Sequence, residues 1–247
     1  MPLLLVFSTA YRLIGATHHR QGQYEDALRA HESAYLAALE AGDALNMAES
    51  RSWQAYGMKA LGRYVETQQA MEAALRIVSD RNDAVSSGLQ ARLLASAAEN
   101  AAAMGDGTRA HDMLVASEAL LHKVDASSDQ FNHGAWLETA AVCALHLGQF
   151  DLAIARFNEA LTALPEDWMA RRVFVTIGLA GALASRGDRE ATLITVRETI
   201  PRLKVLQAQE LNQHFRDSLA KLIVWFPDEP EFRDFVAAPG SGALTDD

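Results

Sequence analysis

Eight histidines and one cysteine are the side chains of this sequence best suited to bind a metal ion or attack a substrate. A zinc site needs three or four ligands that converge on one point. His18 and His19 are adjacent and point to different faces of a helix, and the other histidines are distributed over different predicted elements. Cys143 lies in a run of alanine, valine and leucine, so no cysteine-based zinc site is available. We expect no metal site and no cofactor.

The sequence also lacks the motifs that mark common active sites. It contains no nucleophile elbow, phosphate-binding loop, dinucleotide fingerprint or HExxH zinc motif. Carboxylates such as Glu25, Asp26, Glu32 and Glu40 fall on predicted outer faces of helices, where solvation is expected rather than acid–base chemistry. We predict no catalytic residues and expect that the protein is not an enzyme.

The stretch LETAAVCALHLGQFDLAIARFNEALTALP, from Leu137 to Pro165, contains two helical patterns that meet at Gly148. The positions that define the two patterns are Ala140, Ala141, Ala144, Phe150, Ala153, Phe157, Ala160 and the terminating Pro165. This is the tetratricopeptide (TPR) arrangement, in which small residues let two antiparallel helices approach, a glycine ends the first helix and an aromatic residue begins the second. The stretch therefore predicts a helical hairpin that the rest of the chain repeats.

A helix-ending glycine marks each of five copies of this pattern. The glycines are Gly22, Gly62, Gly105, Gly148 and Gly187, at successive intervals of 40, 43, 43 and 39 residues. These intervals exceed the roughly 34 residues of a tetratricopeptide unit, so longer helices or links are expected. We predict an all-α fold, a right-handed superhelical solenoid of about five TPR-like hairpins plus a C-terminal capping helix.

The sequence after Leu206 predicts the capping helix, which includes the apolar run Leu222–Phe226. A solenoid needs a cap because its last hairpin would otherwise expose an apolar face. A terminal helix buries only one face, so the same run favours a homodimer slightly. We predict a single solenoid domain over residues 1–237 and a disordered tail over residues 238–247, and the link from Asp125 to Asp129 is the most loop-like internal segment.

The first helix of each repeat predicts a binding surface. In a TPR superhelix these helices line a concave groove, so their side chains three or four residues apart, off the small-residue face, meet a ligand. The predicted groove residues are Arg12, Glu49, Trp53, Tyr56, Lys59, Arg92, Ser96, Glu99, Asn100, Glu138 and Phe174. Asn100 is included because a mid-helix asparagine can hydrogen-bond a peptide backbone in both directions.

The predicted groove is charged towards the N-terminal half and apolar towards the C-terminal half. Such a surface suits an extended peptide or a small amphiphile, because charges set the register and an apolar pocket adds affinity. The alternative is that the charges are merely solvated and that Trp53 and Phe174 pack between repeats. We expect a peptide, small-molecule or protein partner in this groove.

Charge and hydropathy argue against other classes of partner. The 22 Lys and Arg against 32 Asp and Glu give a formal net charge of −10, so phosphate backbones should repel the chain and we expect no direct nucleic-acid binding. No apolar run approaches the roughly 18 residues that span a membrane, and no basic residue precedes the apolar start Leu3–Phe7. We expect a cytoplasmic protein without membrane association.

From Val142 to Leu222 the pattern resembles the TPR sensor halves of actinobacterial-type helix-turn-helix transcriptional regulators of the XRE class. The residues that carry the resemblance are Cys143, Leu147-Gly148, Ala160-Leu161, Leu164-Pro165, Arg171-Arg172, Leu179-Ala180, Gly187-Asp188, Glu190-Ala191 and the closing LNQHFRDSLAKL. The stretches GQYEDALRAHESAYLAALEAGD and GRYVETQQAMEAALRI are similar to early repeats of the same family. In that family an N-terminal helix-turn-helix reads DNA, and the repeats sense a peptide or small molecule and mediate dimerisation.

This sequence departs from the family pattern because its first repeat starts within about ten residues of Met1, which leaves no room for a DNA-reading domain. The resemblance implies a TPR binding module that acts as the ligand-sensing and oligomerising domain of a bacterial transcriptional regulator, cut from a longer chain. The alternative is a stand-alone TPR scaffold or adaptor for protein–protein interactions, without a regulatory ligand of its own.

Overall fold

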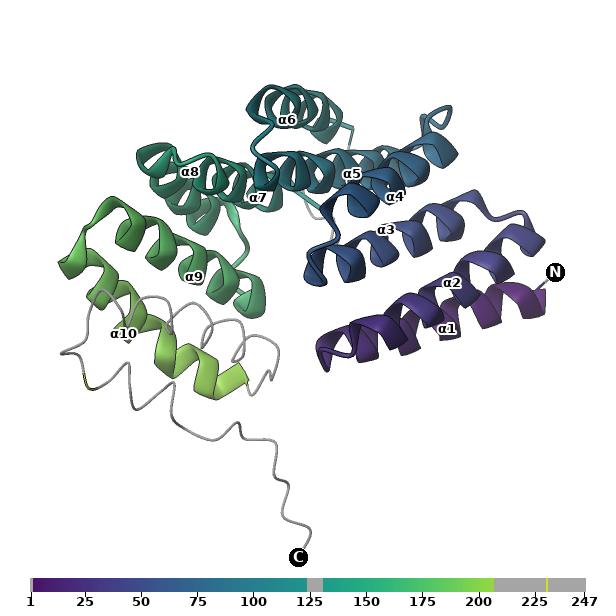
Figure 1. Cartoon of the computed structure of the whole chain (residues 1–247), viewed down its shortest axis with the longest axis horizontal. Coiled ribbons are helices and arrows are strands. Elements are labelled where there is room, and N and C mark those ends of the chain that lie inside the picture. The colour runs from purple at the N-terminus through teal and green to yellow at the C-terminus, as the bar shows by residue number, and fades with distance from the viewer. Residues whose placement is uncertain (1, 124–130, 207–229, 231–247) are drawn as a thin grey trace, which may run out of the picture.

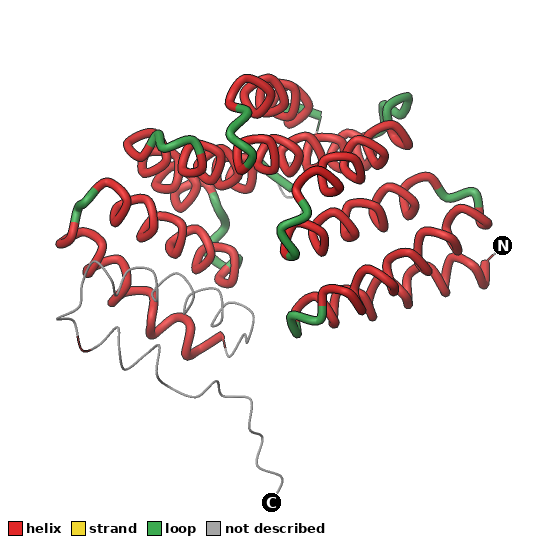
Figure 2. Tube along the Cα trace, in the orientation of Figure 1, coloured by secondary structure: helices red, strands yellow, loops and turns green. Residues whose placement is uncertain are grey.

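The computed structural model of the chain describes residues 2–123, 131–206 and 230. Within these residues every regular element is an α-helix, as predicted. The helices are α1 (Pro2–Arg20), α2 (Tyr24–Ala41), α3 (Ala44–Ala60), α4 (Tyr64–Val78), α5 (Ala84–Ala103), α6 (Gly107–Leu121), α7 (His133–His146), α8 (Phe150–Ala163), α9 (Met169–Arg186) and α10 (Arg189–Leu206). Consecutive helices pair into five hairpins (Figures 1 and 2). The predicted helical solenoid is confirmed for this part of the chain.

Glycines and capping side chains set the ends of the helices. All five glycines that mark the repeats have positive φ angles, from 72° to 86°, which a residue without a Cβ atom adopts at little cost. Aspartates begin several of the helices: Asp43 accepts a hydrogen bond from the backbone N–H of Asn46 at 3.1 Å, and Asp83 accepts one from that of Ser86 at 3.0 Å. The predicted turns within the hairpins are therefore confirmed.

Small residues bring the helices together, as α8 shows. Ala153, Phe157 and Ala160 of α8 are buried and belong to the core cluster shared by α7, α8 and α9. The ring of Phe157 lies against Gly178 of α9, where an added Cβ atom would come within 2.5 Å of the ring. The alanine and aromatic positions of the repeat pattern are thus the positions where helices touch.

The hairpins follow a curve, with the first hairpin at one end and the last described hairpin at the other (Figure 1). The odd-numbered helices contact one another in the series α1, α3, α5, α7 and α9, whereas each even-numbered helix contacts mainly its neighbours in the chain. Figure 1 shows α6 and α8 on the outside of the curve and α5 and α7 nearer its inside. We call the surface of the odd-numbered helices that looks into the curve the inner face.

The third hairpin packs only loosely on the fourth through its second helix. Ala110 and Ser117 are the buried residues of α6, and α6 packs far less on α7 than α4 packs on α5. The third hairpin packs on the fourth mainly through α5, which contacts α7 directly. The inner row of helices therefore passes without a break from the second hairpin to the fourth.

Some predictions lie outside the described residues: the capping helix after Leu206, its apolar run Leu222–Phe226, the tail over residues 238–247 and the link from Asp125 to Asp129. The single-domain boundary and the dimer contact at that run therefore stay predictions. Among the described helices, none has an apolar stretch sufficient for crossing a membrane.

The buried position of Ala153 predicts that a larger side chain there destabilises the fold. Ala153→Leu adds three carbon atoms where α8 meets its neighbours, so the free energy of unfolding should fall by roughly 1 to 3 kcal/mol. Urea denaturation measures this change, and Ala155→Leu on the exposed side of the same helix is the matched control, with little expected effect. Equal stability of Ala153→Leu and wild type would contradict the packing described for α8.

Candidate binding face on the inner helices

The predicted groove residues all lie on odd-numbered helices. Arg12 is on α1; Glu49, Trp53, Tyr56 and Lys59 are on α3; Arg92, Ser96, Glu99 and Asn100 are on α5; Glu138 is on α7; and Phe174 is on α9. Several of these side chains meet across neighbouring helices through hydrogen bonds and ion pairs. The structure therefore assembles much of the predicted set into a row of polar contacts.

Two arginines converge on one carboxylate at the N-terminal part of the row. Arg92 Nη2 of α5 lies 2.7 Å from Glu49 Oε2 of α3, and Arg12 Nη1 of α1 lies 3.7 Å from the same oxygen. Burial is the largest single influence and lowers the pKa of Arg92, but the charge of Glu49, the interaction with Tyr56 and the hydrogen bond to Glu49 together raise that pKa above its ordinary value, so the guanidinium stays charged. We call Arg12, Glu49 and Arg92 the arginine cluster; it links the first three hairpins.

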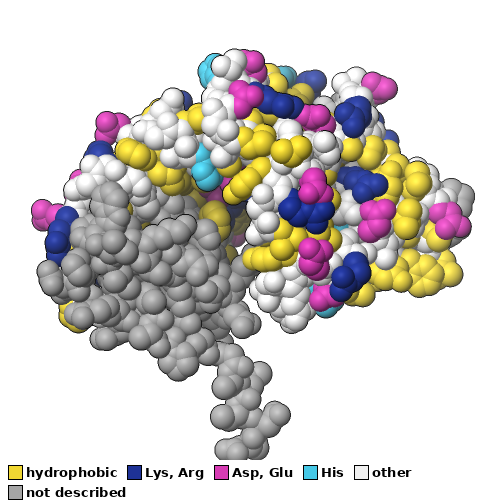
Figure 3. Space-filling view, in the orientation of Figure 1, with side chains coloured by type: hydrophobic (Ala, Val, Ile, Leu, Met, Phe, Trp, Pro, Cys, Tyr) yellow, Lys and Arg dark blue, Asp and Glu magenta, His cyan; other side chains and the backbone are white. Residues whose placement is uncertain are grey.

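Two further contacts join α3 to α5. The Tyr56 hydroxyl and Ser96 Oγ are 2.8 Å apart and share a hydrogen bond, and Lys59 Nζ pairs with the Glu99 carboxylate. These partners are about one repeat apart in sequence, so they occupy similar levels on adjacent inner helices. The N-terminal hairpins also carry side chains of both charge signs close together on the face visible in Figure 3. Charges on this part of the protein are thus mixed rather than segregated.

A third ion pair joins α7 to α9. Arg171 Nε lies 2.5 Å from Glu138 Oε2, and the Glu138 side chain is largely buried. Burial raises the pKa of Glu138, and the charge of Arg171 opposes this only in part. Arg171 was not among the predicted groove residues. It lies three residues before Phe174 and therefore on a similar face of α9, which is the signal that could have found it.

Asn100 lies away from the inner face. It is fully buried, and its Nδ2 atom donates to the backbone oxygen of Tyr64 at 3.0 Å and to Gln68 Oε1 at 3.1 Å, both on α4. Asn100 follows Glu99 by one residue, about 100° around the helix axis, so its side chain meets the neighbouring helix rather than the inside of the curve. This corrects its inclusion among the groove residues: Asn100 joins α5 to α4.

Trp53 packs between the first two hairpins. Its ring is stacked on that of His31 in α2, with centroids 5.7 Å apart and an interplanar angle of 15°, and it meets the ring of Tyr56 edge to face at 5.6 Å. Trp53 nevertheless remains only partly buried. Trp53 therefore packs between hairpins, which is the alternative to ligand contact that the sequence left open. Part of its surface stays accessible.

His31 occupies the repeat position that Phe157 occupies in the fourth hairpin, because each lies nine residues after its glycine. Its ring is fully buried against Gly15, and neither ring nitrogen has a hydrogen-bond partner. Burial, followed by the charges of His19 and Arg12, lowers the pKa of His31 to about 4. His31 is thus an uncharged core residue at neutral pH.

Cys143 has the environment of a packing residue. Burial first, and then the charge of Glu99, raises the pKa of its thiol to about 12. A thiol that stays protonated at neutral pH is a poor nucleophile. In addition, no three or more His, Cys, Asp and Glu side chains of the described residues are grouped so as to hold a metal ion.

Phe174 contributes apolar surface at the C-terminal end of the inner row. Its side chain is 37 % exposed, although it belongs to a helix whose other valines and leucines are mostly buried. Phe174 lies one turn after Arg171 on α9 and offers an accessible aromatic ring there.

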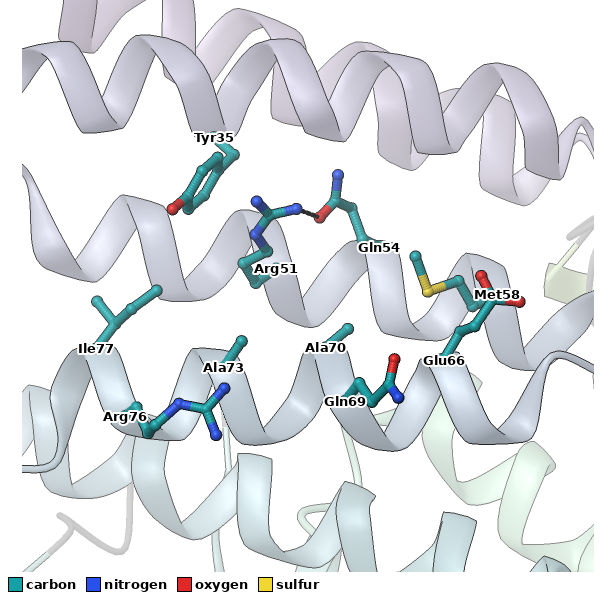
Figure 4. A pocket seen from close by; sticks show the side chains of 10 residues that line it. All are labelled: Tyr35, Arg51, Gln54, Met58, Glu66, Gln69, Ala70, Ala73, Arg76 and Ile77. Atoms are coloured by element: carbon teal, nitrogen blue, oxygen red, sulfur yellow. Dashed lines mark hydrogen bonds between the residues drawn. The ribbon is translucent and has the colours of Figure 1, made fainter.

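The outer side of the solenoid carries a hollow that the sequence reasoning missed. It has a volume of about 500 Å³ and is lined by Tyr35 of α2, by Arg51, Gln54 and Met58 of α3, and by residues of α4 (Figure 4). The Arg51 guanidinium lies 3.7 Å from the centre of the Tyr35 ring and donates to Gln54 Oε1 at 2.7 Å. The spacing of three residues between Arg51 and Gln54 on one helix is the only signal of this contact in the sequence.

A second hollow, of about 420 Å³, lies between α6 and α8 with α7 beneath it. Its lining includes Leu114, Trp136 and Leu147 together with polar residues such as Glu118 and Arg156. Each hollow is lined by two even-numbered helices and by the odd-numbered helix between them in the chain, α3 in the first hollow and α7 in the second. The inner face remains the surface where the predicted residues gather.

The pKa of His31 predicts that stability falls in acid. The unfolded chain binds a proton at the ordinary histidine pKa near 6.5, whereas the folded chain does so only near pH 4. The free energy of unfolding should therefore drop by roughly 3 kcal/mol as the pH falls from about 6.5 to about 4. His31→Phe should remove this drop, because phenylalanine binds no proton.

Urea unfolding of wild type and His31→Phe between neutral pH and pH 4 measures this difference, with His111→Phe at an exposed position as control. Phenylalanine suits the site because Phe157 occupies the equivalent repeat position in the fourth hairpin, where its ring is also buried against a glycine. Parallel pH profiles for wild type and His31→Phe would show that His31 is not the group responsible.

No protein-family model and no curated protein matches this chain. Solved structures do match. A Rap protein complexed with competence and sporulation factor has a TM-score of 0.70 over 94 % of this chain and 72 % of its own, at 14 % identity. BtubC (BKLC) from P. vanneervenii has a TM-score of 0.60 over 82 % of each chain at 15 % identity.

A tetratricopeptide repeat protein from Parabacteroides merdae has a TM-score of 0.51, covering 93 % of this chain and 82 % of its own at 14 % identity. At such low identity the likeness concerns the fold alone. The resemblance to XRE-class regulators stays a prediction. The chain has the fold of TPR-like helical-repeat proteins.

Proposed function

We propose that this chain is a binding module that holds an extended peptide, or an extended segment of a partner protein, along the inner face. The observation that carries the proposal is the row of polar contacts that joins α1, α3 and α5, and again α7 and α9. An extended peptide offers donors, acceptors and side chains at regular intervals, and a row of complementary groups on rigid helices fixes its register.

The ion pairs of the inner face are suited to exchange with a ligand. The Lys59 and Glu99 side chains are each 24 % exposed, so they are neither sealed in the core nor fully solvated. An accessible ion pair contributes only about 0 to 1 kcal/mol to stability. Replacing such a pair by a contact with a ligand therefore costs the fold little, and the side chains remain available for recognition.

The structural comparison supports the same class of function. The Rap protein with the similar fold was solved in complex with competence and sporulation factor, which illustrates that a helical-repeat protein of this shape can hold a second molecule. The support extends to the class of binding module and not to a particular ligand.

The narrower form of the proposal is a ligand-sensing and oligomerising part of a transcriptional regulator, which rests on the resemblance of the repeats to XRE-class regulators. A small molecule could then act in place of a peptide. The second candidate is a stand-alone scaffold for protein–protein contacts, favoured by the likeness of the fold to that of a tetratricopeptide repeat protein. With a formal charge of −10, the chain itself should not bind DNA in either role.

Light scattering with and without a bound peptide separates these two roles. A sensor that controls assembly changes its oligomeric state when the ligand binds, because the ligand favours one of two states. A scaffold binds its partner without such a change. A basic helix-turn-helix encoded in the same reading frame would favour the regulator independently.

Selection from a displayed library of random linear peptides tests the binding proposal. We expect selected peptides to bind Tyr56→Phe and Phe174→Ala about tenfold more weakly than wild type, because each change removes a contact group of the inner face. The melting temperatures of both variants should stay within a few degrees of wild type.

Arg76→Gln, on the outer side of α4, is the matched control and should leave the affinity unchanged. Some peptides could bind both inner-face variants as tightly as wild type but bind Arg76→Gln more weakly. That result would show that the peptide binds at the outer hollow and not on the inner face. Failure to select any peptide with the folded protein would remove the proposal.

A further inference from the structure

The cations and anions of the inner face are not balanced equally along its length. Lys59 pairs with Glu99, and Arg171 pairs with Glu138, so each of these contacts contains one charge of each sign. The arginine cluster differs because two guanidinium groups share the single carboxylate of Glu49. Among the described residues, no other carboxylate forms an ion pair with Arg12 or Arg92. The cluster therefore carries one uncompensated positive charge.

The hydrogen-bond donors of the cluster are also incompletely used. Both arginines approach the same oxygen, Oε2 of Glu49. The Nε atoms of Arg12 and Arg92 are shielded from solvent and have no hydrogen-bond partner. Each guanidinium has five N–H donors, and a shielded donor without a partner costs free energy. The cluster thus lacks an anionic charge, and a ligand can reach only those donors of the two guanidinium groups that lie outside the shielded Nε atoms.

The cluster remains within reach of a ligand. The side chains of Arg12, Glu49 and Arg92 are 26 %, 15 % and 18 % exposed, so they are partly desolvated but not enclosed. Partial desolvation strengthens an ion pair relative to one in bulk water. The next side chains along the row are Trp53 and Tyr56 on α3, which offer an aromatic surface and a hydroxyl group. The positive charge of Arg12 also contributes to the low pKa of His31.

We propose that the arginine cluster binds a carboxylate group of the extended peptide. This inference rests on the proposed function and names the chemistry that its ligand must carry. A carboxylate supplies one negative charge and acceptor atoms that match the planar guanidinium groups, so it balances the cluster one to one. A phosphate group carries nearly two negative charges and would overcompensate the cluster beside Glu49.

The carboxylate can come from the C-terminus of the peptide or from an aspartate or glutamate side chain. Each selected peptide is therefore synthesised in four forms: with a free C-terminus, with an amidated C-terminus, with its acidic side chains changed to amides, and with phosphoserine in place of an acidic residue. Weaker binding of the amidated form would identify the C-terminal carboxylate as the group bound. Weaker binding of the form with amide side chains would identify an aspartate or glutamate side chain. Tighter binding of the phosphoserine form than of the first form would overturn the assignment to a carboxylate.

Arg92→Gln is the informative variant. We expect it to weaken binding of the carboxylate form at least about tenfold and to leave the affinity for the neutralised form nearly unchanged, which is the signature of a direct coupling. Lys59→Gln removes a cation of the same inner face from a balanced pair and is the matched control, with a much smaller difference between the two forms. Raised salt should weaken the carboxylate form more than the neutralised form.

A second measurement checks that the charge imbalance, and not a folding defect, explains the result. Arg92→Gln leaves Arg12 and Glu49 as a balanced pair, so the melting temperature should change little. Glu49→Gln leaves two guanidinium groups facing each other and should lower the melting temperature clearly. A lower melting temperature for Arg92→Gln than for Glu49→Gln would contradict the charge imbalance on which the inference depends.

The two proposals fail in different ways. A peptide that depends on Tyr56 and Phe174 but binds equally well with and without its carboxylates would overturn the carboxylate site and leave the binding module in place. Absence of any peptide that depends on the inner face would overturn both.

Discussion

The close approach of helices at small residues is the constraint on which the rest of the structure depends. An added Cβ atom would come within 2.5 Å of the Phe157 ring at Gly178 and within 2.5 Å of the His31 ring at Gly15. Such contacts leave no room for a larger residue, so they determine the distance and register of successive helices. The Gly178 contact joins the fourth hairpin to the fifth, and the Gly15 contact joins the two helices of the first hairpin, so small residues set the approach of helices both between and within hairpins. The series of hairpins follows a curve (Figure 1).

This curvature explains why polar side chains gather on one side and hollows on the other. On the inside, odd-numbered helices follow one another closely enough for Tyr56 to reach Ser96 and for Arg92 to reach Glu49. On the outside, successive even-numbered helices are spread apart, and the hollows between α2 and α4 and between α6 and α8 lie there. The inner pairs contribute modestly to stability because they are partly exposed, and their main consequence is a defined arrangement of charges.

The inner residues were predictable because their spacing follows the repeat. Glu49 and Arg92 each lie thirteen residues before the glycine that ends their helical pattern, so they occupy equivalent positions in adjacent repeats. Counting back from the glycine therefore gives both residues, and the structure brings their side chains together. Asn100 was predicted from the hydrogen-bonding capacity of its amide, and the structure instead places that amide against α4. Tyr35 and Arg51, which meet on the outer side of the curve, were not predicted. In both cases the contact joins an odd-numbered helix to an even-numbered helix, and it does not lie on the inner face.

By itself, the sequence determined the helices, their ends and the five hairpins of the described chain, because helical spacing, capping residues and positive-φ glycines act within a few residues of one another. The tertiary structure alone decided which charges meet. Glu49 is about one repeat from Arg92 and in a different repeat from Arg12, and nothing local in the chain shows that both arginines reach the same oxygen atom. That outcome depends on the distance and rotation between packed helices, which arise from side-chain volumes over several hairpins at once.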